Sequence, residues 1–295
     1  MDRALAIRNS DAGTADSAHL GDALDSLRAV FDLDVEATSG PEELDAVLAD
    51  AEHVIVCGGD GSLHAVVNAL GRIGRLDAVT LGLLPLGTGN DFARGLDLPL
   101  DPVEAATVIV EGHTVPIDLI KDDHGKLIIN AVHLGIGAEA AAAAVSWKKR
   151  LGPLGYVVGA LISTTKDPSF DLQVLIDDEP LPAGNGLLQV AINNGPFVGG
   201  GTPLSPDANP SDGQLDVAVS YATQLSRRFT YARLLRRGEH VHMDEVLVRH
   251  AHTVTVTGEA FRSSADGEIE DPESARSWIL VPGALRMYVP AVGFP

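Results

Sequence analysis

The sequence predicts an α/β protein with two domains: a three-layer α/β domain with a parallel sheet over residues 1–118, and an antiparallel β-sandwich over residues 119–295. Apolar strands alternate with helical segments in the first part, which is typical of a parallel sheet covered on both faces. After about residue 117, short apolar runs are separated by Gly, Pro and Asp turns, which predicts a sandwich or barrel. A chain of 295 residues is long enough to form both cores.

The N-terminal elements follow in order. Residues 4–8 predict a first strand, and residues 19–30 predict a helix. Asn9 and Gly13 lie between them in a segment rich in turn formers. A further strand and helix precede residue 54. Residues 101–104, Asp-Pro-Val-Glu, predict a helix start with an aspartate cap and proline in the first turn.

Two glycine-rich turns each follow an apolar strand. Residues 54–57 lead into the first turn, and an apolar helical face follows it, with spacing i, i+3, i+4 and i+7. The turn residues are Gly58, Gly59, Asp60, Gly61 and Ser62. Strand, glycine turn and helix together point backbone N–H groups at an anion. Asp60 adds a carboxylate, which predicts a bridging Mg²⁺.

The second turn repeats this pattern after a strand at residues 79–84 that Pro85 ends. Its residues are Gly87, Thr88, Gly89, Asn90 and Asp91. Two such turns from adjacent strands can hold a polyphosphate between them. The sequence therefore predicts a polyphosphate site in the N-terminal domain.

Charge and composition exclude several classes. The net charge of −20 disfavours nucleic acid, whose backbone requires a basic surface. No apolar stretch approaches the roughly 20 residues of a membrane span, and the first residues lack a signal-peptide pattern. Cys57, the single cysteine, is expected to be buried in its strand. We expect a cytoplasmic enzyme with transient contact to a membrane surface.

The motifs resemble those of a known family. Gly58 to Ser62 looks like the GGDG[TS] motif of diacylglycerol, sphingosine and NAD kinases and phosphofructokinases. The segment 85–94, PLGTGNDFAR, is narrower and resembles the bacterial diacylglycerol kinase branch. Ordered companion motifs cover nearly the whole chain. They include Asn130, the segments at 135–139, 150–156, 194–201 and 212–217, and Asp266-Gly267-Glu268.

The resemblance implies an ATP- and Mg²⁺-dependent lipid kinase with an NAD kinase/diacylglycerol kinase-like fold. It implies transfer of the γ-phosphoryl group to a lipid hydroxyl, in the simplest case diacylglycerol to phosphatidic acid. Asp266 would be the base, with Glu268 orienting it or completing a metal shell; from spacing alone, these residues also fit a solvent-exposed turn. Asp212 and Asp216 resemble a metal-binding acidic loop, although two surface residues flanking a strand would show the same pattern.

Nucleotide contacts are implied for Asn9 and Gly13, where the family has a proline after the asparagine and this chain has Ser10. Three other functions stay open. The acceptor could be another lipid alcohol, such as phosphatidylglycerol or a sphingoid base; the protein could be an NAD kinase; or it could be a catalytically weak nucleotide-binding regulator. The oligomeric state is open, a homodimer included.

Membrane contact is expected at Trp147, Lys148, Lys149 and Arg150, where a tryptophan adjoins basic residues and an apolar run follows. A helix packed in the core would give the same pattern. Helical insertions are expected at residues 139–165 and 226–237. The histidine pairs at 240/242 and 250/252 are interpreted as solvated strand residues rather than zinc ligands.

Overall fold

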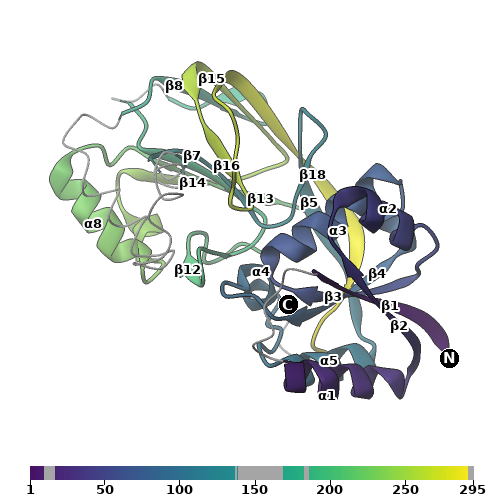
Figure 1. Ribbon diagram of the computed structural model, residues 1–295. Helices are drawn as coiled ribbons and strands as arrows, with labels where there is room; N and C mark the ends of the chain where they lie inside the picture. The colour runs from purple at the N-terminus through teal and green to yellow at the C-terminus, as the bar shows by residue number, and fades with distance from the viewer. Residues whose placement is uncertain (10–16, 137, 139–168, 183–185, 292–295) are drawn as a thin grey trace. The chain divides into compact units, whose positions relative to one another are not determined.

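The computed structural model describes residues 1–9, 17–136, 138, 169–182 and 186–291 (Figure 1). The chain divides into two compact units. The first comprises Met1–Leu119 together with Pro282–Pro295, and the second comprises Ile120–Val281. The expected second domain ran to residue 295, so the return of the chain end to the first unit is a correction. Its cause is the last strand, which pairs in both units.

The first unit contains a parallel sheet, as predicted. Its order is β2-β1-β3-β4-β18, and each of these neighbouring pairs is parallel. The strands are β1 (Asp2–Asn9), β2 (Phe31–Thr38), β3 (His53–Gly58), β4 (Thr80–Pro85) and β18 (Glu273–Tyr288). In this unit, β18 pairs through Arg286 and Met287 with Thr80 and Leu81 of β4. β5 (Thr114–Asp122) also pairs with β18.

Helices cover both faces of this sheet (Figure 1). They are α1 (Ser17–Arg28), α2 (Pro41–Leu48), α3 (Asp60–Arg72), α4 (Asp91–Gly95) and α5 (Pro102–Glu111), with a 3₁₀ turn η2 (Leu76–Ala78). Helices α1 and α5 pack on one face against Ile55 and Cys57 of β3. The expected cap of α5 is confirmed: Asp101 accepts N–H bonds from Val103 and Glu104 at 2.9 and 3.1 Å.

The second unit is a sandwich of two sheets, which confirms the predicted fold class. One sheet has the order β14-β13-β10-β7-β16-β17 and is antiparallel throughout. Its strands are β7 (Ala131–Gly135), β10 (Gln189–Asn193), β13 (Leu215–Ser220), β14 (Val246–Ala251), β16 (Ser263–Ala265) and β17 (Glu268–Ile269). The strand alternation places Val132, Ile192 and Val217 on one face, in the shared core.

The second sheet of this unit contains β15 (Thr253–Phe261) between β8 (Leu172–Ile176) and the first part of β18. β9 (Glu179–Pro180) pairs with β8, and β6 (Leu127–Ile128) pairs with β5 in a hairpin. Val254, Val256 and Trp278 are fully buried against the other sheet. A small ribbon, β11 (Phe197–Val198) and β12 (Thr202–Pro203), stands apart from both.

The other face of the six-stranded sheet is covered by α8 (Leu225–Leu235), which confirms the expected helix at 226–237. Tyr231, Ala232 and Leu235 of α8 pack with Ala191 and Ala218 of the sheet. Trp147, Lys148, Lys149, Arg150 and the expected helix at 139–165 lie outside the described residues. Among the residues that the structure describes, no helix is long and apolar enough to cross a membrane.

One histidine prediction is wrong. His240 was expected on a solvated strand, but it lies in a 3₁₀ turn, η3 (Glu239–His242), and is fully buried. Its Nε2 lies 3.0 Å from the carbonyl oxygen of Leu204, and its ring meets that of Tyr231 edge-on. The alternation of His240 and His242 suggested a strand, but Gly238, directly before η3, is left-handed with φ 71° and turns the chain into the 3₁₀ turn. His250 and His252 are exposed, as expected.

Candidate active site

The first glycine turn joins β3 to α3. Gly58 ends the strand and Gly59 precedes the first residue of the helix. A Cβ on Gly58 would overlap the Ser62 side chain, since the first turn of α3 folds back over it. The N-terminus of α3 thus lies directly at the turn, where the helix dipole favours an anion.

The two glycine turns touch through their backbones. A Cβ on Gly59 would lie 2.8 Å from the Cα of Gly87, and a Cβ on Gly87 would lie 2.6 Å from the Cα of Gly59. No side chain fits at either position. Gly61, Gly87 and Thr88 are nevertheless exposed, so the joined turns present backbone to solvent.

Asn90 holds the second turn in shape. It adopts a left-handed conformation with φ 51°, and its side-chain amide bonds to both polar groups of Gly87. Its Oδ1 accepts the Gly87 N–H at 3.0 Å and its Nδ2 donates to the Gly87 carbonyl at 2.8 Å. Arg94 Nε donates to the Gly89 carbonyl at 3.1 Å. Asn90 therefore shapes the turn, and its predicted contact with the nucleotide stays a prediction.

Asp60 links the two turns by hydrogen bonds. Its Oδ2 accepts the N–H of Asp91 at 3.1 Å, and its Oδ1 accepts the N–H of Phe92 at 3.0 Å. These N–H groups belong to the first turn of α4 and have no partner within the helix. Each oxygen keeps a second lone pair, so the geometry leaves room for the metal contact that the sequence predicts.

The other expected nucleotide contacts are described only in part. Asn9 is the last residue of β1, and Gly13 lies outside the described residues. Cys57, beside the first turn, is buried as expected, and burial raises the pKa of its thiol to about 12. This cysteine is therefore an apolar packing residue rather than a nucleophile.

In the second unit, Asp266 lies in the turn between β16 and β17. Asp266 and Gly267 both have positive φ, 48° and 85°, as in a two-residue hairpin turn. The Asp266 carboxylate accepts the N–H groups of Ile129, Asn130 and Ala131 at 2.8, 2.9 and 3.2 Å. Oδ1 receives two of these bonds and Oδ2 one. Three consecutive backbone donors thus fix the carboxylate in place.

His133 lies close to this carboxylate, and sequence reasoning missed it. It is directly opposite Ser264 in the register of β7 and β16. Burial lowers the pKa of His133 to about 4, although the negative charge of Asp266 acts in the opposite direction. His133 is therefore neutral at physiological pH.

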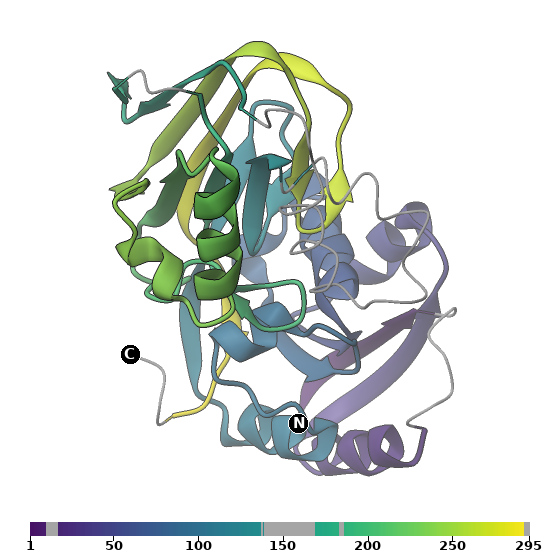
Figure 2. The ribbon, with the colours of Figure 1, turned by 90° about the vertical axis from the view of Figure 1, so that its left-hand side faces the viewer.

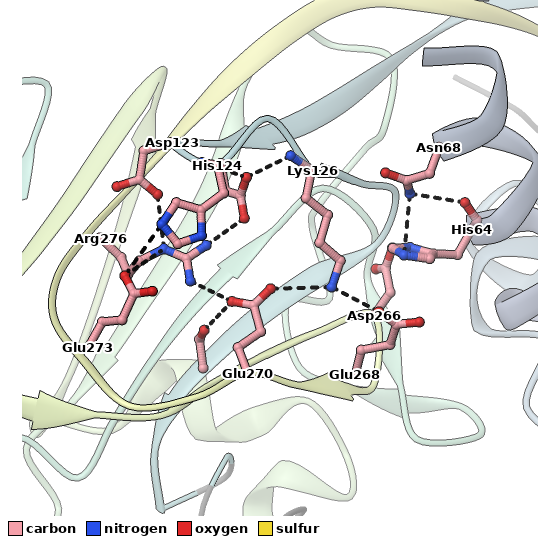
Figure 3. Close-up of polar contacts among 12 residues, drawn as sticks. His64, Asn68, Asp123, His124, Lys126, Asp266, Glu268, Glu270, Glu273 and Arg276 are labelled. Atoms are coloured by element: carbon pink, nitrogen blue, oxygen red, sulfur yellow. Dashed lines mark hydrogen bonds and ion pairs between the residues drawn. The ribbon is translucent and has the colours of Figure 1, made fainter. Parts of the chain in front are cut away.

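Glu268 is part of an ion-pair network that connects strands far apart in the sequence (Figure 3). Lys126 Nζ lies 2.9 Å from Glu268 and 3.2 Å from Glu270. Glu270 in turn accepts from Ser263 and from Arg276, both at 2.7 Å. The network ties the β5–β6 hairpin to the turn that carries Asp266.

Arg276 is the centre of this network. Its guanidinium is 2% exposed and contacts Asp122, Asp123 and Glu270. Burial alone would lower the pKa of Arg276, but these carboxylates raise it. Burial likewise opposes a raised pKa of Lys126, and Glu268 and Glu270 together outweigh burial. No local sequence signal marks these pairs, because Arg276 is separated from Asp122 by 154 residues.

Asp122, Asp123 and His124 offer ligand atoms within 4.8 Å of one another. Both aspartates pair with Arg276, so their carboxylate oxygens already bind a guanidinium. We regard this cluster as part of the network and not as a metal site.

The predicted acidic loop contains Asp212 and Asp216 and lies outside the Arg276 network. Asp216, on β13, is buried, and within the described part of the chain its Oδ2 has no hydrogen-bond partner. Burial raises the pKa of Asp216 to about 6; Asp212 and Asp207 raise it further and His250 lowers it. Asn193 lies directly opposite on β10, and its buried Oδ1 also has no partner. Asp212 accepts the Gln214 N–H at 3.0 Å. Buried carboxylate and amide oxygens without donors suit a hard cation.

The N-terminal and C-terminal parts of the sequence match two different family models. Residues 3–121 match the diacylglycerol kinase catalytic domain, and residues 130–289 match the YegS C-terminal NAD kinase beta sandwich-like domain. A protein of Xanthomonas oryzae pv. oryzae named "Probable lipid kinase YegS-like" is 32% identical, with 94% of this chain and 93% of the relative aligned. A diacylglycerol kinase of Bacillus subtilis is 30% identical over 79% of this chain and 76% of its own.

Solved structures show the same fold. A diacylglycerol kinase from Bacillus anthracis superposes with a TM-score of 0.80 at 24% identity, over 98% of each chain. An NAD kinase from Archaeoglobus fulgidus in complex with ATP superposes with a TM-score of 0.56 at 11% identity, over 100% of this chain and 96% of that one. Since the catalytic-domain and C-terminal models together span nearly the whole sequence, the chain belongs to the diacylglycerol kinase family and is a lipid kinase of the diacylglycerol kinase type.

Proposed function

We propose that this lipid kinase transfers the γ-phosphoryl group of ATP to the hydroxyl of diacylglycerol, giving phosphatidic acid, and that it depends on Mg²⁺. The observation that carries the proposal is the backbone contact between Gly59 and Gly87. Two glycine turns held together at a helix N-terminus leave space for phosphate groups that no side chain fills. The names of the relatives supply the acceptor class.

The nucleotide is assigned to the first unit. The residues proposed to bind it are Asn9, Gly13, Gly58, Gly59, Asp60, Gly61, Ser62, Gly87, Thr88, Gly89, Asn90 and Asp91. Within this set, the structure supports different roles. Gly59 and Gly87 keep the backbones in contact, while Asp60 and Asn90 hold the turns in register through main-chain hydrogen bonds. Binding therefore meets a site that is already shaped.

Asp266 is proposed to accept the proton of the lipid hydroxyl, with Glu268 supporting its turn. A carboxylate has about four lone-pair sites, and three of those on Asp266 receive backbone N–H groups. An ionised carboxylate can accept the proton of a hydroxyl that lies within hydrogen-bond reach. Because the donors fix the orientation of the carboxylate, positioning contributes as well as basicity.

Asp60, Asp212 and Asp216 are proposed metal ligands. Bound Mg²⁺ would neutralise charge on the phosphates in phosphoryl transfer. The unpartnered Oδ2 of Asp216 supports a cation on the acidic loop. Transient membrane contact through Trp147, Lys148, Lys149 and Arg150 remains part of the proposal, on the sequence pattern alone.

The test is transfer of ³²P from ATP to a panel of acceptors in mixed micelles with Mg²⁺. The panel contains diacylglycerol, phosphatidylglycerol, sphingosine and, in solution, NAD. Asp266→Asn is compared with Asp271→Asn, a matched change at an exposed aspartate of the same segment. Thermal unfolding and ATP binding are measured for both variants.

We expect labelled phosphatidic acid from wild type and Asp271→Asn, and a loss of at least about 100-fold in Asp266→Asn with ATP binding kept. Near-normal turnover of Asp266→Asn would exclude it as the base. Label in NAD and in no lipid would overturn the proposed acceptor. ATP binding without transfer to any acceptor would favour a nucleotide-binding regulator.

A further inference from the structure

Helix α8 and the residues that follow it carry a concentration of positive charge that contrasts with the negative net charge of the chain. The chain has a net charge of −20. Between residues 221 and 243, however, Glu239 is the one acidic residue. The basic residues of this stretch, histidines aside, are Arg227, Arg228, Arg233, Arg236 and Arg237.

These arginines have two different environments. Arg228 is buried, and Arg227 pairs with Glu245 of the neighbouring loop. Arg233, Arg236 and Arg237 are exposed. Within the described part of the chain, their side chains make no ion pair. Their charge is therefore available to an anionic partner.

Two large apolar side chains lie on the same helix. Leu225 is 52% exposed and Phe229 is 48% exposed. Leu225, Phe229 and Arg233 follow one another at i, i+4 and i+8, so they form one stripe along the helix. The opposite side of α8 holds Tyr231, Ala232 and Leu235 in the core. Packing against the six-stranded sheet thus fixes one side of α8. Figure 2 shows the helix in green, in the second unit.

We propose that this surface, formed by Leu225, Phe229, Arg233, Arg236 and Arg237, docks on an anionic lipid bilayer. The proposal rests on the proposed function, since a kinase of membrane lipid must reach a bilayer. Leucine and phenylalanine can enter the interface while the arginines meet lipid phosphates, as in amphipathic interfacial helices. An acidic protein would complement the arginines, but it would not require two exposed apolar side chains beside them.

The uneven distribution of charge also determines which surface of the protein faces the membrane. An anionic membrane repels a molecule of net charge −20 as a whole. The protein therefore binds through the surface on which positive charge is concentrated, because the local electrostatic potential there attracts the membrane. Each arginine near such a surface strengthens binding by roughly fivefold, and three of them by on the order of 100-fold. The attraction falls with added salt, since the Debye length shortens.

The experiment is flotation of the full chain with two kinds of vesicle: phosphatidylcholine alone, and phosphatidylcholine with phosphatidylglycerol. Two variants remove the surface: the triple change R233Q/R236Q/R237Q and the double change L225S/F229S. The triple control R3Q/R28Q/R72Q removes the same charge from the first unit. Ile279→Ser is the control for an exposed apolar residue, 44% exposed on β18.

We expect wild type and both controls to float with the anionic vesicles and to remain in solution with phosphatidylcholine alone. The triple arginine variant should bind on the order of 100-fold more weakly, and the double apolar variant should also lose binding. Equal binding of all variants, or failure of wild type to float, would overturn the docking surface. Capture of wild type by an acidic protein but not by vesicles would also overturn it.

A second measurement separates this proposal from the kinase assignment. All variants are assayed with a short-chain diacylglycerol dissolved as monomers, for which no bilayer is needed. If docking is the role of the surface, every variant phosphorylates this substrate at the wild-type rate, and the surface variants lose activity only on vesicles. Equal loss on monomers and on vesicles would contradict docking. Vesicle binding without phosphorylation by wild type would contradict the proposed function instead.

Discussion

Gly59 and Gly87 are in direct backbone contact, although they belong to different turns: a Cβ on Gly87 would lie 2.6 Å from the Cα of Gly59. Gly59 has φ −102°, a conformation open to any residue. The requirement for glycine at this position is therefore steric and not conformational. The contact explains why both turns carry glycine at these positions.

The first prediction concerns this contact. Gly59→Ala and Gly87→Ala should each separate the turns, destabilise the first unit by about 1–3 kcal/mol, and abolish ATP binding. Gly21→Ala, outside the proposed site, is the matched control, since a Cβ there meets nothing within 4 Å. Urea unfolding and titration with ATP provide the readout. Normal ATP affinity in Gly59→Ala would show that the contact is dispensable.

The second prediction concerns Asp60. Asp60→Asn keeps one carbonyl oxygen, so one of the two N–H groups, of Asp91 or Phe92, loses its acceptor. We expect a loss of about 1–3 kcal/mol in unfolding free energy. Asp77→Asn, at an exposed aspartate of η2, should change little. If Asp60 also binds the metal, its variant will need more Mg²⁺ for half-maximal activity; an unchanged Mg²⁺ requirement would leave Asp60 with the structural role alone.

A third prediction addresses the acidic loop. Mg²⁺ should raise the melting temperature of wild type, because the buried Oδ2 of Asp216 has no other partner. Asp216→Asn should lose this response and, without Mg²⁺, be at least as stable as wild type, since a buried charge is removed. His124→Gln, in the cluster held by Arg276, should keep the response. Differential scanning calorimetry with and without Mg²⁺ measures the melting temperatures that test this prediction.

The fourth prediction is a pH dependence. Burial lowers the pKa of His240 from 6.5 to about 4, while its hydrogen bond to Leu204 acts in the opposite direction. The folded state therefore binds this proton less readily than the unfolded chain. The stability contributed by neutral His240 is complete above pH 6.5 and is lost as the pH falls toward 4.

The matching experiment is urea unfolding of wild type and His240→Gln across this pH range. Wild type should lose on the order of 3 kcal/mol relative to the variant between neutral pH and the acid end. His252→Gln, at an exposed histidine, should follow wild type. Parallel curves for wild type and His240→Gln would show that this histidine does not titrate on unfolding.

The sequence predicted elements whose signals are local. The strand at 54–57, the apolar face of α3 and the Asp101 cap of α5 depend on residues a few positions apart, and all are present. His240 shows the limit: alternation over two residues resembled a strand, whereas the left-handed Gly238 sets a different path.

Much of the candidate site depends on pairs that are distant in the sequence. Asp60 bonds to N–H groups 31 and 32 residues later, and Asp266 bonds to N–H groups more than 130 residues earlier. The motifs identified these carboxylates as functional, but not the backbone donors that hold them. No sequence motif includes Arg276 or Lys126, and only the folded chain brings them beside Glu270.

The shared strand β18 has a consequence for biosynthesis. Because Arg286 and Met287 pair with Thr80 and Leu81 of β4, the parallel sheet of the first unit receives one of its strands only after the second unit, Ile120–Val281, has been synthesised. Until that strand leaves the ribosome, β4 is an uncovered edge open to aggregation. A gene fragment ending at residue 119 would keep both glycine turns and still lack a strand of the sheet that supports them.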